Sequence, residues 1–190
     1  MLEDYAVLPL QFCTLYNSES RVLGMLDAGG GGLRDGLDRL TGATEWGVKI
    51  FCNREQLVAW AAESSGELQP MRETIVRMSA GAGYMLRKKI ALAAQQLAES
   101  LERSHAQASH LRLSGVARAA ASHPAQAPDV HGQPGAMALN GSYLVDDQEQ
   151  PRFEAELAQL AEQLAPLGFR CELTGPWPPY SFASIERDAS

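Results

Sequence analysis

The spacing of hydrophobic residues along this chain predicts four strands separated by helices. Ala6–Tyr16 (AVLPLQFCTLY) is apolar and rich in β-favouring residues, which predicts a strand with Pro9 near its start or at a sheet edge. Glu45–Cys52 (EWGVKIFC) follows a period of two with one polar face, as expected for a half-buried strand. Two further strands are predicted within Ala136–Asp147 and over Phe169–Thr174.

Shorter helices are predicted between these strands. One begins at Asn17 or Ser18 and ends near Asp27, where Ala28–Gly32 interrupts it. A second helical piece follows, with three residues on one face: Leu33, Leu37 and Leu40. The sequence therefore predicts a broken helical region before the second strand.

Two other helices carry recognisable end signals. Asn53 is expected to cap a helix that runs to about Glu63, with Gln56 at the third helical position. Pro151 suits the first turn of the last helix, and Gly168 fits the position that stops it. Apolar residues repeat through this last helix at steps of four and three: Phe153, Leu157, Leu160, Leu164 and Leu167.

The longest predicted helix follows Gly81–Gly83 and extends through Arg118–Ala121. One apolar stripe runs along it: Leu86, Ile90, Ala93, Leu97 and Leu101. His123–Gly135 contains three prolines and two glycines, which favours a flexible loop.

The resulting element order predicts an α+β fold with a ferredoxin-like antiparallel sheet, helices packed on it, and a long added helix. We divide the chain into a first β-α-β-α half (1–70), the long helical segment (71–122), the flexible loop (123–135) and a β-α-β half with a proline-rich corner (136–190).

Composition narrows the class of protein. With 190 residues, of which 45% are hydrophobic, the chain suits one domain or two small ones. No apolar run approaches the roughly 20 residues needed to span a bilayer, and acidic residues stand where a signal peptide would be basic. The net charge of −7 argues against a general nucleic-acid binder, so we expect a soluble cytoplasmic protein.

The charge is unevenly distributed. Residues 72–118 hold eight basic and three acidic residues, a balance of +5, so the remainder carries −12. This basic segment either attracts an acidic partner or pairs with its own body. Within it, Arg87, Lys88 and Lys89 are candidate partner contacts, with a solvated helix face as the alternative.

The sequence contains few residues in the patterns that are typical of catalytic or metal-binding sites. Cys13, Cys52 and Cys171 fall in predicted strands and suit reduced, buried residues, and no Cys-x-x-Cys pair is present. The glycine run Gly29–Gly32 is followed by Leu-Arg-Asp rather than the Gly-Lys-Ser/Thr of a phosphate loop. We therefore expect no enzyme activity, no cofactor and no metal.

The segment Gly175–Phe182 (GPWPPYSF) forms a rigid, extended corner with three prolines in four residues. Its exposed positions would suit the groove of a partner, with four candidate contacts: Trp177, Pro178, Pro179 and Tyr180. Alternatively, Trp177 and Phe182 pack across the sheet and close the core, in which case Trp177→Ala would cost about 3–5 kcal/mol.

GPWPPYSF resembles the C-terminal signature of the gas vesicle protein F/L family (GvpF/GvpL). Four other segments resemble family elements in the same order: VLPLQFCT (Val7–Thr14), EWGVKIF (Glu45–Phe51), GAGYMLRKK (Gly81–Lys89) and LNGSYLVDDQEQPRF (Leu139–Phe153). From these motifs we expect several residues to support the fold: Trp46, Gly47, Lys49, Tyr84, Tyr143, Gly175 and Phe182.

The resemblance is to the C-terminal portion of the family. Typical members carry another α/β domain before the VLP strand, whereas six residues precede Val7 here, so most of that N-terminal domain is expected to be missing. Cys13 stands where glycine is usual, and Gln11 where arginine is common.

The resemblance implies a non-enzymatic accessory protein, or a minor shell-associated protein, of gas vesicle assembly. Its expected partners are the hydrophobic shell subunit and other accessory proteins, and its expected location is the gas vesicle. A ferredoxin-like ligand-sensing module or small enzyme unrelated to vesicles is the alternative.

Overall fold

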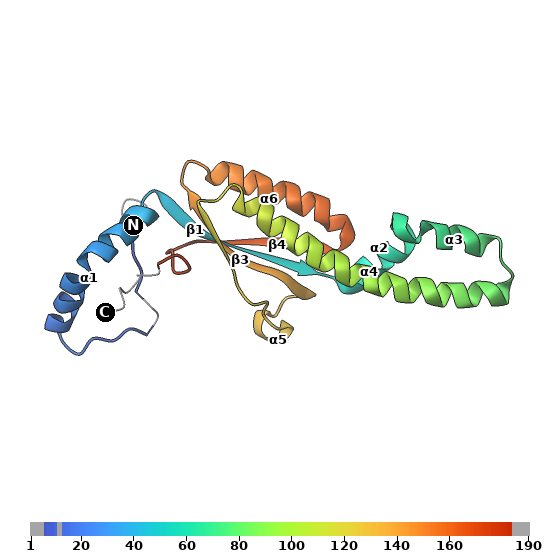
Figure 1. Ribbon diagram of the computed structural model, residues 1–190, viewed down its shortest axis with the longest axis horizontal. Helices are drawn as coiled ribbons and strands as arrows, with labels where there is room; N and C mark the ends of the chain where they lie inside the picture. The colour runs from blue at the N-terminus through green and yellow to red at the C-terminus, as the bar shows by residue number, and fades with distance from the viewer. Residues whose placement is uncertain (1–5, 11–12, 184–190) are drawn as a thin grey trace.

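The fold is built on a four-stranded antiparallel sheet with the strand order β2-β3-β1-β4. The computed structural model describes residues 6–10 and 13–183 (Figure 1). Four strands make the sheet: β1 (Ala43–Cys52), β2 (Ala119–Ser122), β3 (Ala136–Asp146) and β4 (Phe169–Trp177). β1 lies at the centre and pairs with both β3 and β4. This order and its helical connections give the predicted ferredoxin-like α+β topology.

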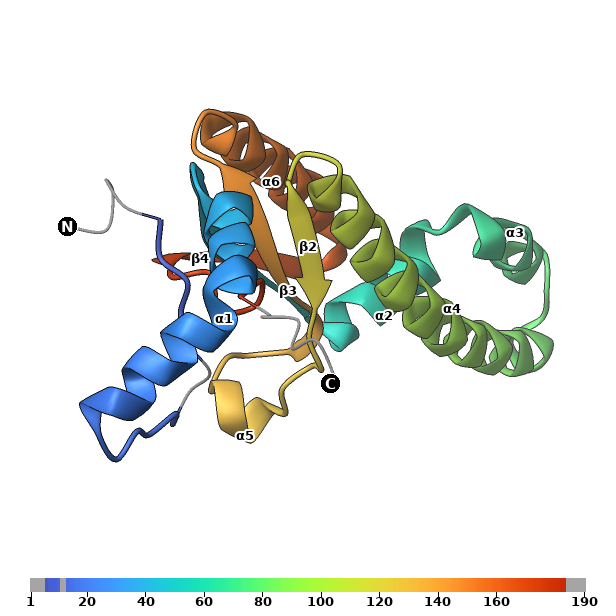
Figure 2. The same ribbon diagram turned by 60° about the vertical axis from the view of Figure 1, so that its left-hand side comes forward.

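Two helices cover one face of the sheet. α6 (Gln150–Leu164) and the C-terminal half of α4 (Ala80–Ser114) lie side by side over it (Figures 1 and 2). The predicted period of two in β1 is confirmed, because Val48, Ile50 and Cys52 all point into the main core. The core also takes Tyr143 from β3 and the predicted stripe of α6, including Phe153.

The predicted helix ends are confirmed where a side chain or glycine marks them. The side chain of Asn53 accepts a hydrogen bond from the Gln56 backbone N–H (3.1 Å), which starts α2 (Arg54–Ser64). Pro151 lies in the first turn of α6. After the short turn η2 (Ala165–Leu167), Gly168 adopts φ 89°, a conformation that favours glycine.

A helical hairpin projects beyond the sheet (Figure 1). It consists of α2, the turn η1 (Gly66–Leu68), α3 (Gln69–Val76) and the N-terminal half of α4. A separate small core holds it together, formed by Ala61, Leu68, Ile90 and Ala94. α4 includes Gly81–Gly83 in its first turn, so the long helix begins before these glycines and not after them as predicted.

The predicted N-terminal elements are wrong in two respects. Residues 6–10 and 13–16 form no strand, and Gln11 and Phe12 lie outside the described residues. α1 (Glu19–Leu40) is one continuous helix that passes through Gly29–Gly32. Apolar or small residues keep their helical spacing across the glycine run, and Gly36 lies against the Leu8 side chain, which a Cβ would approach to 3.1 Å.

The fourth strand of the sheet comes from a segment that was predicted to be helical. β2 includes Ala119–Ala121 and pairs with β3, while α4 ends at Ser114. The Arg118 backbone N–H donates to Leu144 O (2.7 Å), so the chain enters the ladder within four residues of the helix end. One short helix, α5 (Pro128–His131), lies inside the predicted loop 123–135. The flexibility of that loop and the division into segments stay predictions.

Candidate functional site

The predicted contact residues fall into two separate surfaces. Arg87, Lys88 and Lys89 lie on α4 near the free end of the helical hairpin, whereas the corner Trp177–Tyr180 follows β4 at the other end of the sheet (Figure 1). The structure therefore brings together the members of each group but does not bring the two groups together.

The first surface covers the free end of the hairpin, and we call it the tip surface. It combines exposed apolar and cationic side chains from the α3–α4 connection and the outer side of α4: Val76, Arg77, Met78, Tyr84, Met85, Arg87, Lys88, Lys89 and Leu92. Val76 is 86% exposed, and Met85 and Leu92 are each 60% exposed. Single exposed apolar residues are ordinary, but a group of them on one end of a helical hairpin indicates a contact surface.

The cations of the tip surface have no acidic partner within the part of the chain that the structure describes. Among the described residues, Arg77, Arg87, Lys88 and Lys89 take part in none of the salt bridges, which use other arginines. The Lys88 ammonium instead lies 5.4 Å from the centre of the Tyr84 ring, one helical turn away. Tyr84, expected to support the fold, is 54% exposed.

The second surface is the proline-rich corner. Trp177 is 54% exposed and Tyr180 is 60% exposed, so the expectation that Trp177 closes the core is wrong. Pro179 is buried, and Phe182 and Pro178 are partly buried. The strand ends at Trp177, past a register shift opposite Glu45–Gly47 that carries the indole to the rim.

A groove of about 680 Å³ lies beside this corner. Its walls include Trp46, Trp177 and the three prolines at 176, 178 and 179, together with Val7 and Leu40. Within the described residues, the buried Nε1 of Trp46 has no hydrogen-bond acceptor. The groove thus offers aromatic and proline surfaces, while the Trp46 indole N–H is buried away from solvent.

A buried polar network holds the corner against the open face of the sheet, and sequence reasoning missed it. The Glu45 carboxylate accepts hydrogen bonds from the Ser181 backbone N–H (2.9 Å) and hydroxyl (2.6 Å). The Ser181 hydroxyl is 3.0 Å from that of Ser142, which is 3.0 Å from His123 Nε2. The signal in the sequence was Glu45 itself, an acidic residue on the polar face of a central strand.

Two predicted fold glycines have a clear steric role at this end of the sheet. A Cβ at Gly47 would lie 2.5 Å from Thr174 Oγ1. At Gly175, where φ is 129°, it would lie 3.1 Å from both Glu45 O and the Trp46 ring. The expected Tyr143 is fully buried, with its hydroxyl 2.9 Å from His110 Nδ1, whereas Lys49 lies partly buried on the open face.

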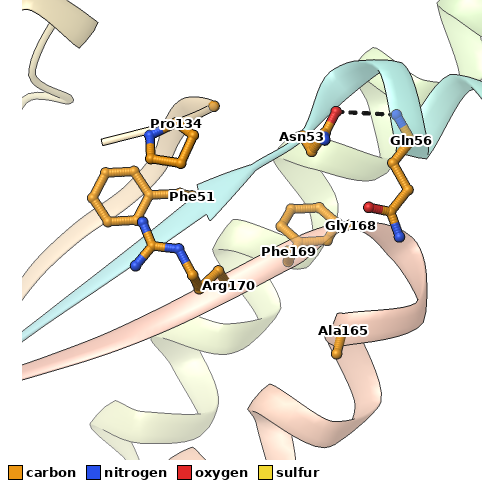
Figure 3. A pocket seen from close by; sticks show the side chains of 9 residues that line it. Phe51, Asn53, Gln56, Pro134, Ala165, Gly168, Phe169 and Arg170 are labelled. Atoms are coloured by element: carbon orange, nitrogen blue, oxygen red, sulfur yellow. Dashed lines mark hydrogen bonds between the residues drawn. The ribbon is translucent and has the colours of Figure 1, made fainter. Parts of the chain in front are cut away.

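A smaller pocket of about 240 Å³ lies at the far end of β1 and β4 (Figure 3). The Arg170 guanidinium stacks under the Phe51 ring at 4.8 Å. It also donates to Glu172 and Gln133, so the cation is already engaged by the fold. These contacts leave the guanidinium little capacity for a ligand.

The titratable groups of the core are shifted by burial. Burial, with a smaller contribution from Glu102, raises the pKa of Cys52 to about 11. Burial also raises the pKa of the Tyr143 phenol and lowers that of His105. Cys13, by contrast, is exposed in a turn, so the expectation of a buried strand cysteine is wrong there.

No group of three or more His, Cys, Asp or Glu residues suited to a metal ion occurs in the described part of the chain. Within the same residues, no helix combines the length and apolarity needed to cross a membrane.

Comparisons with known proteins agree over nearly the whole chain. The family model described as gas vesicle synthesis protein GvpL/GvpF matches residues 1–184. Gas vesicle protein L of a Streptomyces species (strain CB03234) is 33% identical over 188 residues, which cover 95% of this chain and 64% of that protein. The chain thus spans just under two thirds of the length of that relative.

Two crystal structures share the fold. Gas vesicle protein GvpF from Microcystis aeruginosa matches 95% of this chain and 71% of its own with a TM-score of 0.62 and 19% identity. GvpF from Anabaena sp. PCC7120 matches 96% of this chain and 71% of its own with a TM-score of 0.67 and 20% identity.

Proposed function

This chain belongs to the GvpL/GvpF family of gas vesicle synthesis proteins, and on that premise we propose that it is a non-enzymatic accessory protein that binds the hydrophobic shell subunit during gas vesicle assembly. Family membership across residues 1–184 supports a gas vesicle role. The finer role, contact with the shell subunit, rests on the exposed apolar side chains of this fold.

One observation carries the proposal. Large apolar side chains stay exposed, as at Val76 and Leu92 on the hairpin and Trp177 at the corner. A shell subunit that excludes water from a gas space has a strongly apolar surface, which would aggregate before assembly. A soluble protein with apolar contact surfaces can cover that subunit until it is incorporated.

Co-purification tests this function directly. We expect the full chain to retain the shell subunit encoded with it, and we expect deletion of its gene to reduce vesicle formation. Failure to bind, together with undisturbed vesicles after deletion, would contradict the proposal.

A second measurement separates an assembly factor from a retained component. An assembly factor is released, so washed and floated vesicles should contain little of this chain relative to the shell subunit. A constant amount that survives washing would instead make it a minor constituent of the shell.

A further inference from the structure

We propose that the tip surface binds an amphipathic helix whose apolar face is flanked by acidic side chains. The inference deepens the function proposed above and rests on it only for the identity of the natural partner. The kind of partner that we propose follows from where charged and apolar side chains lie on α4.

The N-terminal half of α4 is apolar on two opposite sides. Its inner side packs Ile90 and Ala94 into the hairpin core. Its outer side exposes Met85 and Leu92, which are seven residues apart and therefore share one face. A helix that is already anchored on one side and still apolar on the other is suited to pack a second helix.

The charges along this stretch of the sequence have a single sign. From Val76 to Leu92 the sequence has four cationic residues and no acidic one. Lys88 lies one turn before Leu92 and one turn after Tyr84, within the exposed apolar strip. Because no salt bridge within the described residues uses these exposed cations, they can pair with acidic groups of another molecule.

The apolar side chains also suit an adaptable helix-binding surface. Met78 and Met85 are flexible and polarisable, and they can adjust to side chains of different shape. Charge complementarity then sets the orientation of the partner, because acidic residues beside its apolar face would meet Arg87, Lys88 and Lys89.

Two synthetic helical peptides of about 18 residues, or five turns, test the inference. They carry the same leucine face and differ only in having glutamate or lysine on either side of it. We expect the full chain to bind the glutamate peptide at least about tenfold more tightly than the lysine peptide, with the difference shrinking as salt is raised. Equal binding of the two peptides, or no binding of the glutamate peptide, overturns the proposal.

The same helix supplies matched control variants. Lys88→Glu should weaken binding of the glutamate peptide about tenfold or more, whereas Arg103→Glu makes the same charge change at an exposed position outside the surface and should change it less than about twofold. Leu92→Gln should weaken binding of the glutamate peptide by a similar factor. Leu111→Gln, at a residue of matching exposure (63%), should leave that binding unchanged. Circular dichroism confirms that all four variants fold.

Three further outcomes separate the alternatives. If vesicles of phosphatidylserine and phosphatidylcholine bind in a Lys88-dependent manner while the glutamate peptide does not, the partner is a lipid surface and the proposal fails. If Lys88→Glu instead abolishes self-association of the chain without affecting the peptide, the partner is a second copy and the proposal also fails. If wild-type chain binds the shell subunit and the tip variants bind it equally well, the tip is not that interface, although the proposed function stands.

Discussion

The two halves of α4 form one continuous helix but differ in how their polar groups are used. In the C-terminal half, Arg112 donates to Glu156, Gln159 and Gln163 of α6, and Glu102 accepts from Arg54 of α2. In the N-terminal half, the basic residues have no such partners among the described residues, and apolar side chains face outward.

This difference separates the part of α4 that supports the fold from the part that we propose as a contact surface. Polar side chains that fix α4 on the sheet are satisfied within the molecule, because an unpaired buried group would destabilise it. The hairpin end carries four basic residues, against two in the second half of α4, and leaves them in solvent, where they contribute little to folding. The first half of α4 is thus available for recognition, and the second half supports the sheet.

We expect the greatest loss of stability from a substitution in the core beneath the C-terminal half of α4. Phe153 is fully buried, and its ring lies 5.4 Å from that of Tyr143. Phe153→Ala should lower the free energy of unfolding by about 3–5 kcal/mol, measured by urea denaturation, because it removes a large side chain and leaves a cavity. Val130→Ala, at a 67% exposed position, is the control. A loss below about 1 kcal/mol would mean that this core is not the main support of the fold.

The reactivity of the Cys52 thiol tests whether the junction between the sheet and the helical hairpin is closed. Cys52 is the last residue of β1, just before α2. Its pKa of about 11 keeps it protonated at pH 8, since Glu102 and burial outweigh the opposing effect of Arg54. Relative to its unshifted value of 9.0, the reactive thiolate is about 100-fold less populated. Thiol labelling should therefore be slow at pH 8, rise toward pH 11, and be preceded by labelling of exposed Cys13. Equal labelling rates for Cys13 and Cys52 would show that the junction between the sheet and the hairpin opens.

A smaller effect is expected at the hairpin. Ile90→Ala should cost about 2 kcal/mol, because the hairpin core has only four buried apolar residues. Amide hydrogen exchange should show lost protection in α2, α3 and the first half of α4, while β1 and β3 keep theirs. Loss of protection throughout the sheet would contradict the separation of the two regions. Leu92→Ala, at an exposed position, should leave the exchange pattern unchanged.

The smallest effect is expected at the corner. Trp177→Ala should lower stability by less than about 1 kcal/mol, measured as a small shift in Tm, because the indole is 54% exposed. This value replaces the 3–5 kcal/mol expected for a core tryptophan. A large decrease in Tm would mean that Trp177 supports the core. The tip surface would then be the better candidate for recognition.

The ferredoxin-like topology was predicted correctly from the sequence, although one of the four predicted strands was wrong. The prediction counted Ala6–Tyr16, where the described residues form no strand, and assigned the true edge strand Ala119–Ser122 to a helix. A run of alanines has high helix propensity and no period of two, so local signals favour a helix there. Pairing with β3 overrides that preference.

The elements that could be predicted from the sequence are those whose local signals agree with their environment. The alternation in β1, the Asn53 cap, the stripe of α6 and the Gly168 stop were all predictable, because side-chain period and backbone conformation are local properties. The basic character of the tip was also predictable from composition.

Which residues lie together and which stay exposed could be seen only in the folded chain. The network from Glu45 to Ser181 spans 136 residues, and no local pattern indicates it. The exposure of Trp177 and of the outer side of α4 likewise depends on where β4 ends and how far the hairpin projects from the sheet. Burial and pairing are properties of the folded chain, and here they leave the cations at the start of α4 in solvent beside exposed apolar side chains.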